Sequence, residues 1–234
     1  MLKQAGVDVL TGVLVDACAL MNRRFLHAMK HQKPYVILKW AESRDGFLAP
    51  DKHTCNELDF AKLKQLTGNI AQQLNHKWRT EEDAILIGTE TARMDNPQLT
   101  ARKWHGRNPI RLVLDLNNRL DNSLRVFNAE AKTYKIMYED VSTSSEISSI
   151  PIQRNKPLVE QILVQCTKLK IQSLIVEGGA QLLQAFIQDN QWQEARVFTA
   201  NKKLHSGLKA PLISGNTCFS QQLQNDVLRF ILPQ

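Results

Sequence analysis

The feature that most constrains the fold is an alternation between short, almost wholly apolar runs and segments whose apolar residues repeat with a helical period. The apolar runs predict strands at 35–40, 84–88, 110–115, 133–138, 173–177, 195–200 and 227–232. Runs this apolar are typical of strands that are buried on both faces. Helical spacing follows a predicted cap at Thr67 over residues 70–78 and recurs at 158–163 and 182–187. The chain is therefore predicted to be an α/β protein whose sheet is covered by helices on both faces.

The composition is typical of a soluble globular protein. With 234 residues, 43% of them hydrophobic, the chain can fill one sizeable core, or a domain of about 200 residues that carries a tail. No apolar run approaches the ~18 residues that span a bilayer, and the N-terminus lacks the organisation of a signal peptide. We therefore expect a cytoplasmic protein with no membrane partner. The four cysteines are far apart with no CxxC, so no metal site is expected.

The basic charge balance does not point to nucleic acid. The formal net charge is +7, and residues 1–39 contribute +4 of it. Aromatic residues make up only 6% of the chain, and no basic stripe is interleaved with aromatics as an RNA-binding face requires. A small anionic ligand fits better, although a solvated basic surface explains most of these charges. The polar, serine-rich stretch 139–150 is expected to be a surface loop.

The stretch LIVEGGAQLLQAF, residues 174–186, passes from a strand through Glu177, Gly178 and Gly179 into an amphipathic repeat. Glycines are common in any tight strand-to-helix turn because they adopt backbone angles that other residues avoid. A helix N-terminus with uncovered amides is also a phosphate site, and glycine lets a ligand approach the backbone. These two interpretations are not separated by the glycines alone.

A second stretch, HKWRTEEDAILIGTETARMDNPQLTAR (76–102), places polar groups after the central strand 84–88. Ligands of open α/β sheets bind outside the carboxyl ends of the strands, so this loop and the Glu177 turn are candidates for one cleft. The competing interpretation is structural: Asn-Pro marks a turn, Thr89 caps a short helix and Arg79 ends one.

Four stretches together resemble one family: KPYVILKWAESRDGFLAP (33–50), residues 76–102, NPIRLVLD (108–115) and SLIVEGGAQLLQAF (173–186). In this order and spacing they resemble the reductase domain of the bifunctional riboflavin-biosynthesis deaminase/reductase. The resemblance implies a dihydrofolate-reductase-like fold with a mixed central sheet flanked by helices. It also implies NADPH-dependent reduction of 5-amino-6-(5-phosphoribosylamino)uracil, the ribosyl group becoming ribityl, and a homodimer.

The resemblance also assigns binding residues. The resemblance assigns NADPH contacts to two residues of the 76–102 stretch and to the turn and helix start that run from Gly178 towards Ala185. The assigned residues are Thr91, Asp95, Gly178, Gly179, Ala180, Gln181 and Leu182. Substrate contacts transfer to Arg79, Leu99, Arg102 and Glu177. Guanidinium groups suit a phosphoribosyl group because they grip phosphate oxygens in bidentate fashion. A carboxylate such as Glu177 accepts hydrogen bonds from the N–H groups of a uracil or from sugar hydroxyls.

Two residues are catalytic candidates. Lys39 is unusual in a buried strand, where a lysine is costly unless it is paired or its pKa is lowered, so it is a candidate acid; the alternative is that it snorkels at the strand end. Glu177 is the other candidate for the proton, or for holding the open-chain sugar. Arg119 is a candidate for the 2′-phosphate of NADPH. The family-like SRDG motif at 43–46 either shapes the floor of the cofactor site or serves as a turn.

The chain departs from the family pattern in two places. At KQLTGN (64–69), Gln65 stands where the family has a tryptophan beside the cofactor, and a substrate serine is missing. The His-x-Glu and Pro-Cys-x-x-Cys motifs of the zinc deaminase half do not occur, so no deaminase activity is expected. Residues 1–33 nevertheless resemble the end of that domain, its last strand and a helical linker, or form an arm used in dimer contact. Residues 34–234 are the predicted reductase domain.

Two functions of other classes stay open. One is a catalytically silent nucleotide-binding domain of the same fold, which the altered 64–69 segment permits. The other is a nucleic-acid-binding or interaction protein, which only the basic charge balance suggests.

Overall fold

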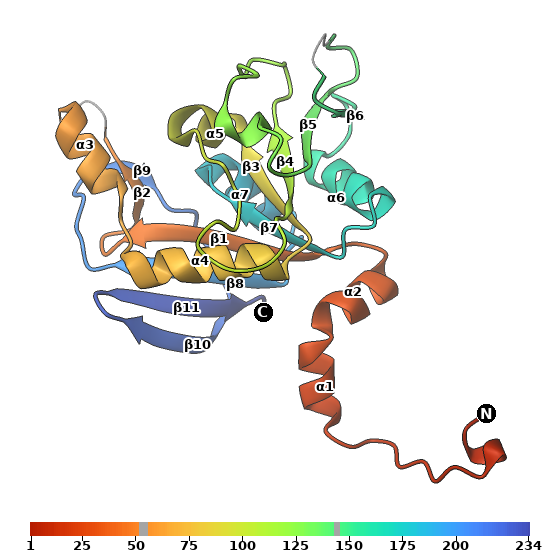
Figure 1. The fold of residues 1–234 in the computed structure, drawn as a ribbon. Helices are drawn as coiled ribbons and strands as arrows, with labels where there is room; N and C mark the ends of the chain where they lie inside the picture. Colours follow the sequence, from red (N-terminus) through yellow and green to blue (C-terminus); the bar gives the residue numbers. More distant parts are fainter. Residues whose placement is uncertain (52–55, 143–145) are drawn as a thin grey trace.

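A nine-stranded sheet organises the computed structural model, which describes residues 1–51, 56–142 and 146–234 (Figure 1). Its strands, in spatial order, are β10 (Asn216–Leu223), β11 (Asp226–Leu232), β8 (Glu194–Ala200), β1 (Tyr35–Ser43), β7 (Ser173–Glu177), β3 (Ala84–Gly88), β4 (Ile110–Leu114), β5 (Thr133–Tyr138) and β6 (Ser149–Ile152). From β8 to β6 every neighbouring pair is parallel, whereas β11 and β10 add to the edge antiparallel. A separate antiparallel pair joins β2 (Phe47–Pro50) to β9 (Gly207–Lys209).

The central strands are apolar on both faces because each face carries its own core. On β1, Val36, Leu38 and Trp40 contribute to one core, and Tyr35 and Ile37 contribute to the other. This alternation follows from the two-residue period of a strand. The predicted burial of the central strands on both faces is thereby confirmed.

Helices cover both faces as predicted. Helices α6 (Leu158–Lys168) and α7 (Ala180–Gln188) pack on the face of Val36, and α4 (Asn69–Glu81) and α5 (Thr89–Asp95) pack on the face of Ile37. Helix α3 (Glu57–Lys64) lies beyond the end of the sheet, beside β2 and β9 (Figure 1). Short 3-10 turns occur at η1 (Lys3–Ala5) and η2 (Arg125–Phe127).

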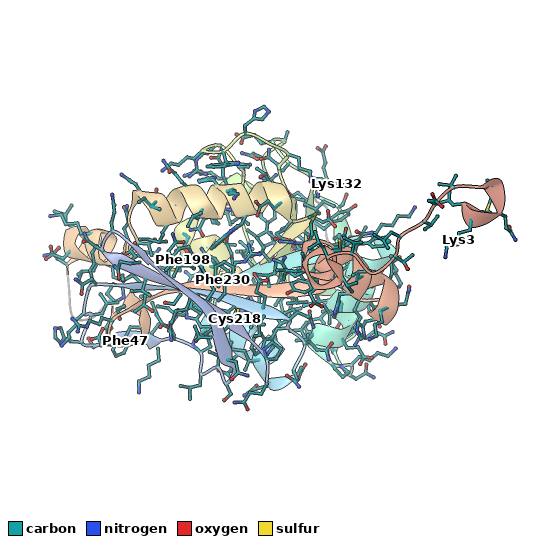
Figure 2. The ribbon with its side chains drawn as sticks, turned by 90° about the horizontal axis from the view of Figure 1, so that it is seen from below. Lys3, Phe47, Lys132, Phe198, Cys218 and Phe230 are labelled. Atoms are coloured by element: carbon teal, nitrogen blue, oxygen red, sulfur yellow. The ribbon has the colours of Figure 1, made fainter. Side chains whose placement is uncertain are left out.

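The N-terminal residues form an arm that projects from the body (Figure 1). Its helices are α1 (Val15–Met21) and α2 (Arg23–His31); the strand expected at the start of the arm does not form. Figure 2 shows Lys3 at the tip, far from Phe198 and Phe230 in the body. Helix α2 is tied to the body by ion pairs from Arg23 to Glu194 and from Arg24 to Glu82.

All seven strands predicted from the sequence are confirmed, but three local predictions are wrong. Helix α4 begins at Asn69 with Gly68 as its N-cap, so Thr67 does not cap it; the Gly68 N–H donates to Asp226 at 2.8 Å. The expected loop 139–150 ends earlier, because β6 begins at Ser149, while 143–145 lie outside the described residues. The Thr89 hydroxyl donates to the Leu114 carbonyl at 2.5 Å instead of capping α5. None of the described helices combines the length and apolar character that a membrane crossing requires.

Candidate active site

A cavity of about 900 Å³ lies at the carboxyl ends of β1, β7 and β3. It is the crevice in which ligands of parallel α/β sheets bind. Eight residues predicted from the sequence line it, namely Lys39 and seven from the two stretches that suggested a cleft: Arg79, Thr91, Asp95, Leu99, Glu177, Gly178 and Gly179. The expectation that the two stretches face one cleft is confirmed.

Three charged side chains meet in this cavity. Strands β1 and β7 are parallel neighbours with Lys39 opposite Glu177 in register, and both residues lie on the face that α4 covers. Helix α4 supplies Arg79. The carboxylate of Glu177 lies 3.7 Å from the Lys39 ammonium and 3.2 Å from the Arg79 guanidinium. Lys39 is therefore paired inside the cavity and does not snorkel into solvent.

Burial and pairing oppose each other in these groups. Burial lowers the pKa of Lys39, and the positive charge of Arg79 adds to this effect, while Glu177 opposes it. Burial disfavours the charged form of Glu177, but Lys39 and Arg79 together outweigh it and hold the pKa of Glu177 below its usual value. Glu177 is thus ionised at neutral pH, and Lys39 is a stronger acid than a surface lysine.

The turn into helix α7 follows Glu177 directly and lines the same cavity. Gly178 and Gly179 have φ of 81° and 68°, and Gly179 is the N-cap with no side-chain cap bond. The first intrahelical bond of the helix is donated by the Leu183 N–H to the Gly179 carbonyl. The amides of Ala180, Gln181 and Leu182 precede it, so no intrahelical carbonyl occupies them. Their side chains do not line the cavity, and Leu182 is part of the core.

The two glycines are constrained differently. A Cβ built on Gly178 would lie 2.7 Å from Cγ2 and 2.8 Å from Oγ1 of Thr91 on α5. A Cβ on Gly179 would meet Thr91 only at 3.5 Å. Gly178 is therefore required by the close approach of Thr91, whereas Gly179 is required by its backbone conformation alone.

Asp95 has a partner that the sequence did not suggest. Its carboxylate pairs with the ammonium of Lys64 at the end of α3, which also donates to the Met94 carbonyl at 3.0 Å. Lys202 holds the next residue by donating to the Gln65 carbonyl at 2.8 Å. Lys64 and Gln65 both line the cavity, so α3 forms one of its walls. The one sequence feature that drew attention to this wall is that Lys64 is the first residue of KQLTGN (64–69), the segment that departs from the family pattern.

A second wall was also missed. It consists of β2 and β9, which place Leu48, Ala49, Pro50, Gly207 and Leu208 on the cavity. A Cβ on Gly207 would lie 2.0 Å from the Ala49 carbonyl oxygen, so the two strands approach closely. These strands are three and four residues long and carry no clear two-residue period, which is why the sequence did not reveal them.

The loop after α5 carries the remaining predicted substrate residues. Leu99 is buried and has the left-handed φ of 57°, and the Thr100 carbonyl accepts from Arg79 at 3.2 Å. Arg102 is exposed and is not among the lining residues, although its charge acts on Arg79. His76 of α4 is buried beside them. Burial and the charges of Arg79 and Arg102 lower the pKa of His76 to about 4, so it is neutral at pH 7.

Two further candidates lie away from the cavity lining. The SRDG motif forms a turn in which the Ser43 hydroxyl donates to Asp45 at 2.7 Å, and Asp45 accepts from the amides of Leu204 and His205. Neither Ser43 nor Asp45 lines the cavity, so the turn interpretation fits this motif. Arg119 is exposed at the end of β4, also outside the lining. Among the described residues, no group of three or more His, Cys, Asp or Glu side chains is arranged to hold a metal ion.

Comparison with known proteins identifies relatives of the whole fold. The family described as the RibD C-terminal domain matches residues 34–226. A riboflavin biosynthesis protein RibD from Synechocystis is 31% identical over 95% of this chain and 60% of its own length. A deaminase/5-amino-6-(5-phosphoribosylamino)uracil reductase from Thermotoga maritima superposes with a TM-score of 0.85 at 25% identity, over 99% of this chain and 66% of that one.

The coverage is uneven between this chain and its relatives. The chain spans between 49% and 60% of the length of the curated relatives that it matches. A riboflavin biosynthesis reductase from Saccharomyces cerevisiae superposes with a TM-score of 0.67 at 14% identity, over 91% of this chain and 98% of that one, which shows the shared fold alone. The predicted mixed central sheet flanked by helices is confirmed.

Proposed function

Because the chain belongs to the RibD C-terminal domain family, we propose that it reduces the ribosyl group of 5-amino-6-(5-phosphoribosylamino)uracil to the ribityl group. The observation that carries the proposal is the convergence in one cavity of a buried charged cluster and an uncapped helix N-terminus. The charged cluster consists of Lys39, Arg79 and Glu177, and Gly178 and Gly179 precede the uncapped N-terminus of α7. A redox reaction between two anionic molecules needs two such anchoring points in one site.

The chain's residues fit a nicotinamide dinucleotide, and we assign NADPH. The amides of the first α7 turn and the partial positive charge of the helix N-terminus suit a phosphate group. Gly178 and Gly179 leave the backbone open to close approach, and Thr91 lies against them. When bound, NADPH supplies a hydride, which no side chain can provide. Asp95, with Lys64 beside it, is assigned to the hydroxyl groups of the cofactor.

The charged cluster is assigned to the substrate and to its protons. Reduction at the sugar requires a proton on the ring oxygen or on the nitrogen, and Lys39 has a lowered pKa and a position inside the cavity. Glu177 holds the Lys39 ammonium in place and accepts from the N–H groups of the pyrimidine or the hydroxyls of the sugar.

Arg79, Leu99 and Arg102 are assigned to the phosphoribosyl group. Arg79 already donates to Glu177 and to Thr100, and its Nε is buried with no partner among the described residues, as is the Thr100 hydroxyl. Buried polar atoms are usually hydrogen-bonded, so these two support a polar ligand at this position. Arg102, exposed at the margin, brings the second positive charge.

The proposal extends to the organisation of the chain. Residues 34–234 are the reductase domain, and residues 1–33 are the end of an upstream deaminase domain together with its linker. The ion pairs that tie α2 to Glu82 and Glu194 support a fixed orientation of this linker. We further propose that the active form is a homodimer, which sedimentation of the purified chain tests.

The experiment is an assay of NADPH oxidation by the purified chain with enzymatically prepared substrate. We expect turnover, with a higher kcat/KM for NADPH than for NADH. Equal kcat/KM values would contradict the cofactor assignment. Gln65, at the position of the family tryptophan, favours one alternative, a nucleotide-binding domain without activity. That alternative predicts NADPH binding in a fluorescence titration without any turnover. If the chain neither binds NADPH nor turns over substrate, both the reductase and the inactive nucleotide-binding domain are excluded.

A further inference from the structure

Arg111 on β4 is a fully buried cation that forms no ion pair within 4.0 Å among the described residues, although the charge of Glu130 acts on it from a distance. Its guanidinium is 0% exposed, and burial lowers its pKa. All five of its N–H groups are used: Nε donates to Thr133, Nη1 to Gln98 and Asn128, and Nη2 to Asn128 and Ala131, at 2.5 to 3.1 Å. Every acceptor is a neutral oxygen. An unpaired charge is costly to bury, so its position in this fold needs an explanation.

The acceptors belong to two loops that Arg111 joins. The carbonyl of Gln98 lies in the loop 96–102 between α5 and β4, and the other acceptors lie in the segment 128–133 before and within β5. A more exposed bond joins the same two loops, from the Gln98 side chain to Glu130. Asn108 links them indirectly, because it donates to the Glu130 carbonyl and accepts from the Ala101 N–H. Arg111 is the buried centre of this contact.

The loop 96–102 is the wall of the cavity on the proposed substrate side. Pro97 and Leu99 line the cavity, and Thr100 binds Arg79. Leu99 has a φ of 57°, which is uncommon for a bulky residue and persists only where its surroundings enforce it. Its neighbours on both sides are fixed: Arg111 holds the Gln98 carbonyl, and Arg79 holds the Thr100 carbonyl.

We propose that Arg111 is a positioning residue that holds the loop 96–102, and Leu99 in its left-handed conformation, in the shape that binds the substrate. This inference rests on the proposed function. Arg111 itself does not line the cavity. It acts through the Gln98 carbonyl, and the cofactor residues at Gly178 and Gly179 are not attached to it.

The neighbouring strand offers a matched control. Lys135 on β5 is 1% exposed and donates to Asn118, Leu120 and Asn122 at 2.9 to 3.3 Å, so it too is a buried cation that ties down a loop. It differs from Arg111 in that its ammonium also lies 3.6 Å from the buried carboxylate of Asp115 in the same loop, so its loss should cost at least as much stability. That loop, residues 115–122, contributes nothing to the cavity lining. Removing either cation leaves buried acceptors unpaired, so both losses destabilise the fold. Only the loss of Arg111 disturbs the substrate wall.

The test compares Arg111→Met, Arg111→Lys and Lys135→Met in the full chain. Arg111→Lys keeps the charge but offers three donors for five acceptors, and it serves if Arg111→Met does not fold. We expect the KM for the substrate to rise at least about tenfold in Arg111→Met, since a misplacement of about 1 Å costs up to about 100-fold. Arg111→Lys lies between it and the wild type. In both Arg111 variants the KM for NADPH should change less than about twofold. This is far less than a tenfold change, which corresponds to about 1.4 kcal/mol.

Hydrogen exchange of residues 97–102, followed by mass spectrometry, gives a readout that does not need turnover. We expect faster exchange in both Arg111 variants and wild-type exchange in Lys135→Met. Equal substrate KM values for Arg111→Lys and Lys135→Met, with unchanged exchange of the loop, would overturn the role of Arg111. If the wild type itself shows no turnover, the proposed reaction fails, and the exchange data alone decide whether Arg111 orders the loop.

Discussion

The contact between Thr91 and the α7 turn gives a prediction that a pair of single substitutions tests. Gly178→Ala and Gly179→Ala each add one methyl group to adjacent residues with positive φ. Only at Gly178 does the new Cβ come within 3.0 Å of another side chain, at 2.7 Å from Cγ2 and 2.8 Å from Oγ1 of Thr91. Gly179→Ala is therefore the control for every effect that is not this contact.

The magnitudes follow from three terms, of which only the last differs between the two variants by design. A positive φ costs an alanine about 1–2 kcal/mol, and both variants carry a cost of this order, with φ at 81° for Gly178 and 68° for Gly179. The smaller entropy of the unfolded chain, which stabilises by about 0.4–1 kcal/mol, is also common to both. Overpacking against Thr91 adds about 1–3 kcal/mol for Gly178→Ala alone. At ~2–4 °C for each kcal/mol, Gly178→Ala should melt about 2–12 °C below Gly179→Ala.

Thermal unfolding by calorimetry measures the difference, and a Thr91→Ala background identifies its source. That change removes Oγ1 and Cγ2 and leaves the Thr91 Cβ at 3.3 Å from the new methyl group. The gap between the two glycine variants should then largely close, as a double-mutant cycle requires for residues in contact. Equal melting temperatures in the wild-type background, or a gap that persists without the threonine side chain, would refute the reasoning.

Three further predictions concern the charged groups. Glu177→Gln should lower Tm at neutral pH. The pKa of Glu177 in the folded protein lies below its usual 4.5, so its contribution to stability is lost as the pH falls through that folded-state pKa. The difference in Tm between the variant and the wild type, measured by calorimetry, should therefore narrow below pH 4.5. A gap that is constant with pH would contradict this. The pKa of His76 is lowered from 6.5 to about 4, so between these pH values the imidazole is neutral in the folded protein and protonated in the unfolded chain. The free energy of unfolding of the wild type should therefore fall as the pH is lowered from 6.5 to 4. Urea unfolding should not find this decline in His76→Gln. An equal decline in both proteins would assign it to other groups. Arg102→Ala should raise the substrate KM about tenfold, whereas Arg119→Ala, an exposed arginine outside the cavity lining, should leave it unchanged; equal effects would reduce Arg102 to surface charge.

The strands that the sequence predicted and the ones it did not differ in how they are buried. A strand such as 84–88 is enclosed by neighbours on both sides and helices on both faces, so nearly every residue must be apolar and the run is visible. Strand β10 is an edge whose residues are almost all exposed, and its sequence NTCFSQQL carries no burial signal. Strand β6 begins in a serine-rich stretch, with Ile150 and Ile152 as its only buried positions. Pairing with an already formed neighbour, not local sequence, creates these strands.

The candidate site was predictable to the extent that it follows strand ends. Glu177 ends β7, Gly178 follows it, and Thr91 lies in the first turn after β3, where polar residues next to apolar runs stand out. The pairing of Lys39 with Glu177 was not predictable, because it depends on β1 and β7 being neighbours in one register although more than 100 residues separate them. The contact of Lys64 with Asp95 depends likewise on how α3 lies against α5, which no periodicity encodes.

The register of β1 and β7 also explains how the cavity holds a lysine and remains suited to an anion. Lys39 and Arg79 bring two positive charges to one carboxylate, so this part of the cavity has an excess of one positive charge. Without Arg79, the charges of Lys39 and Glu177 would cancel and leave no net positive charge. Without Glu177, the positive charges of Lys39 and Arg79 would repel each other at close range. The carboxylate therefore holds both cations in place while leaving net positive charge toward an incoming phosphoribosyl group. At the adjoining start of α7, backbone amides and not side-chain charge are the proposed partners of the cofactor phosphate. The two anionic ligands are thus attracted by different means, and removing the charge of Glu177 should disturb the first without weakening the second.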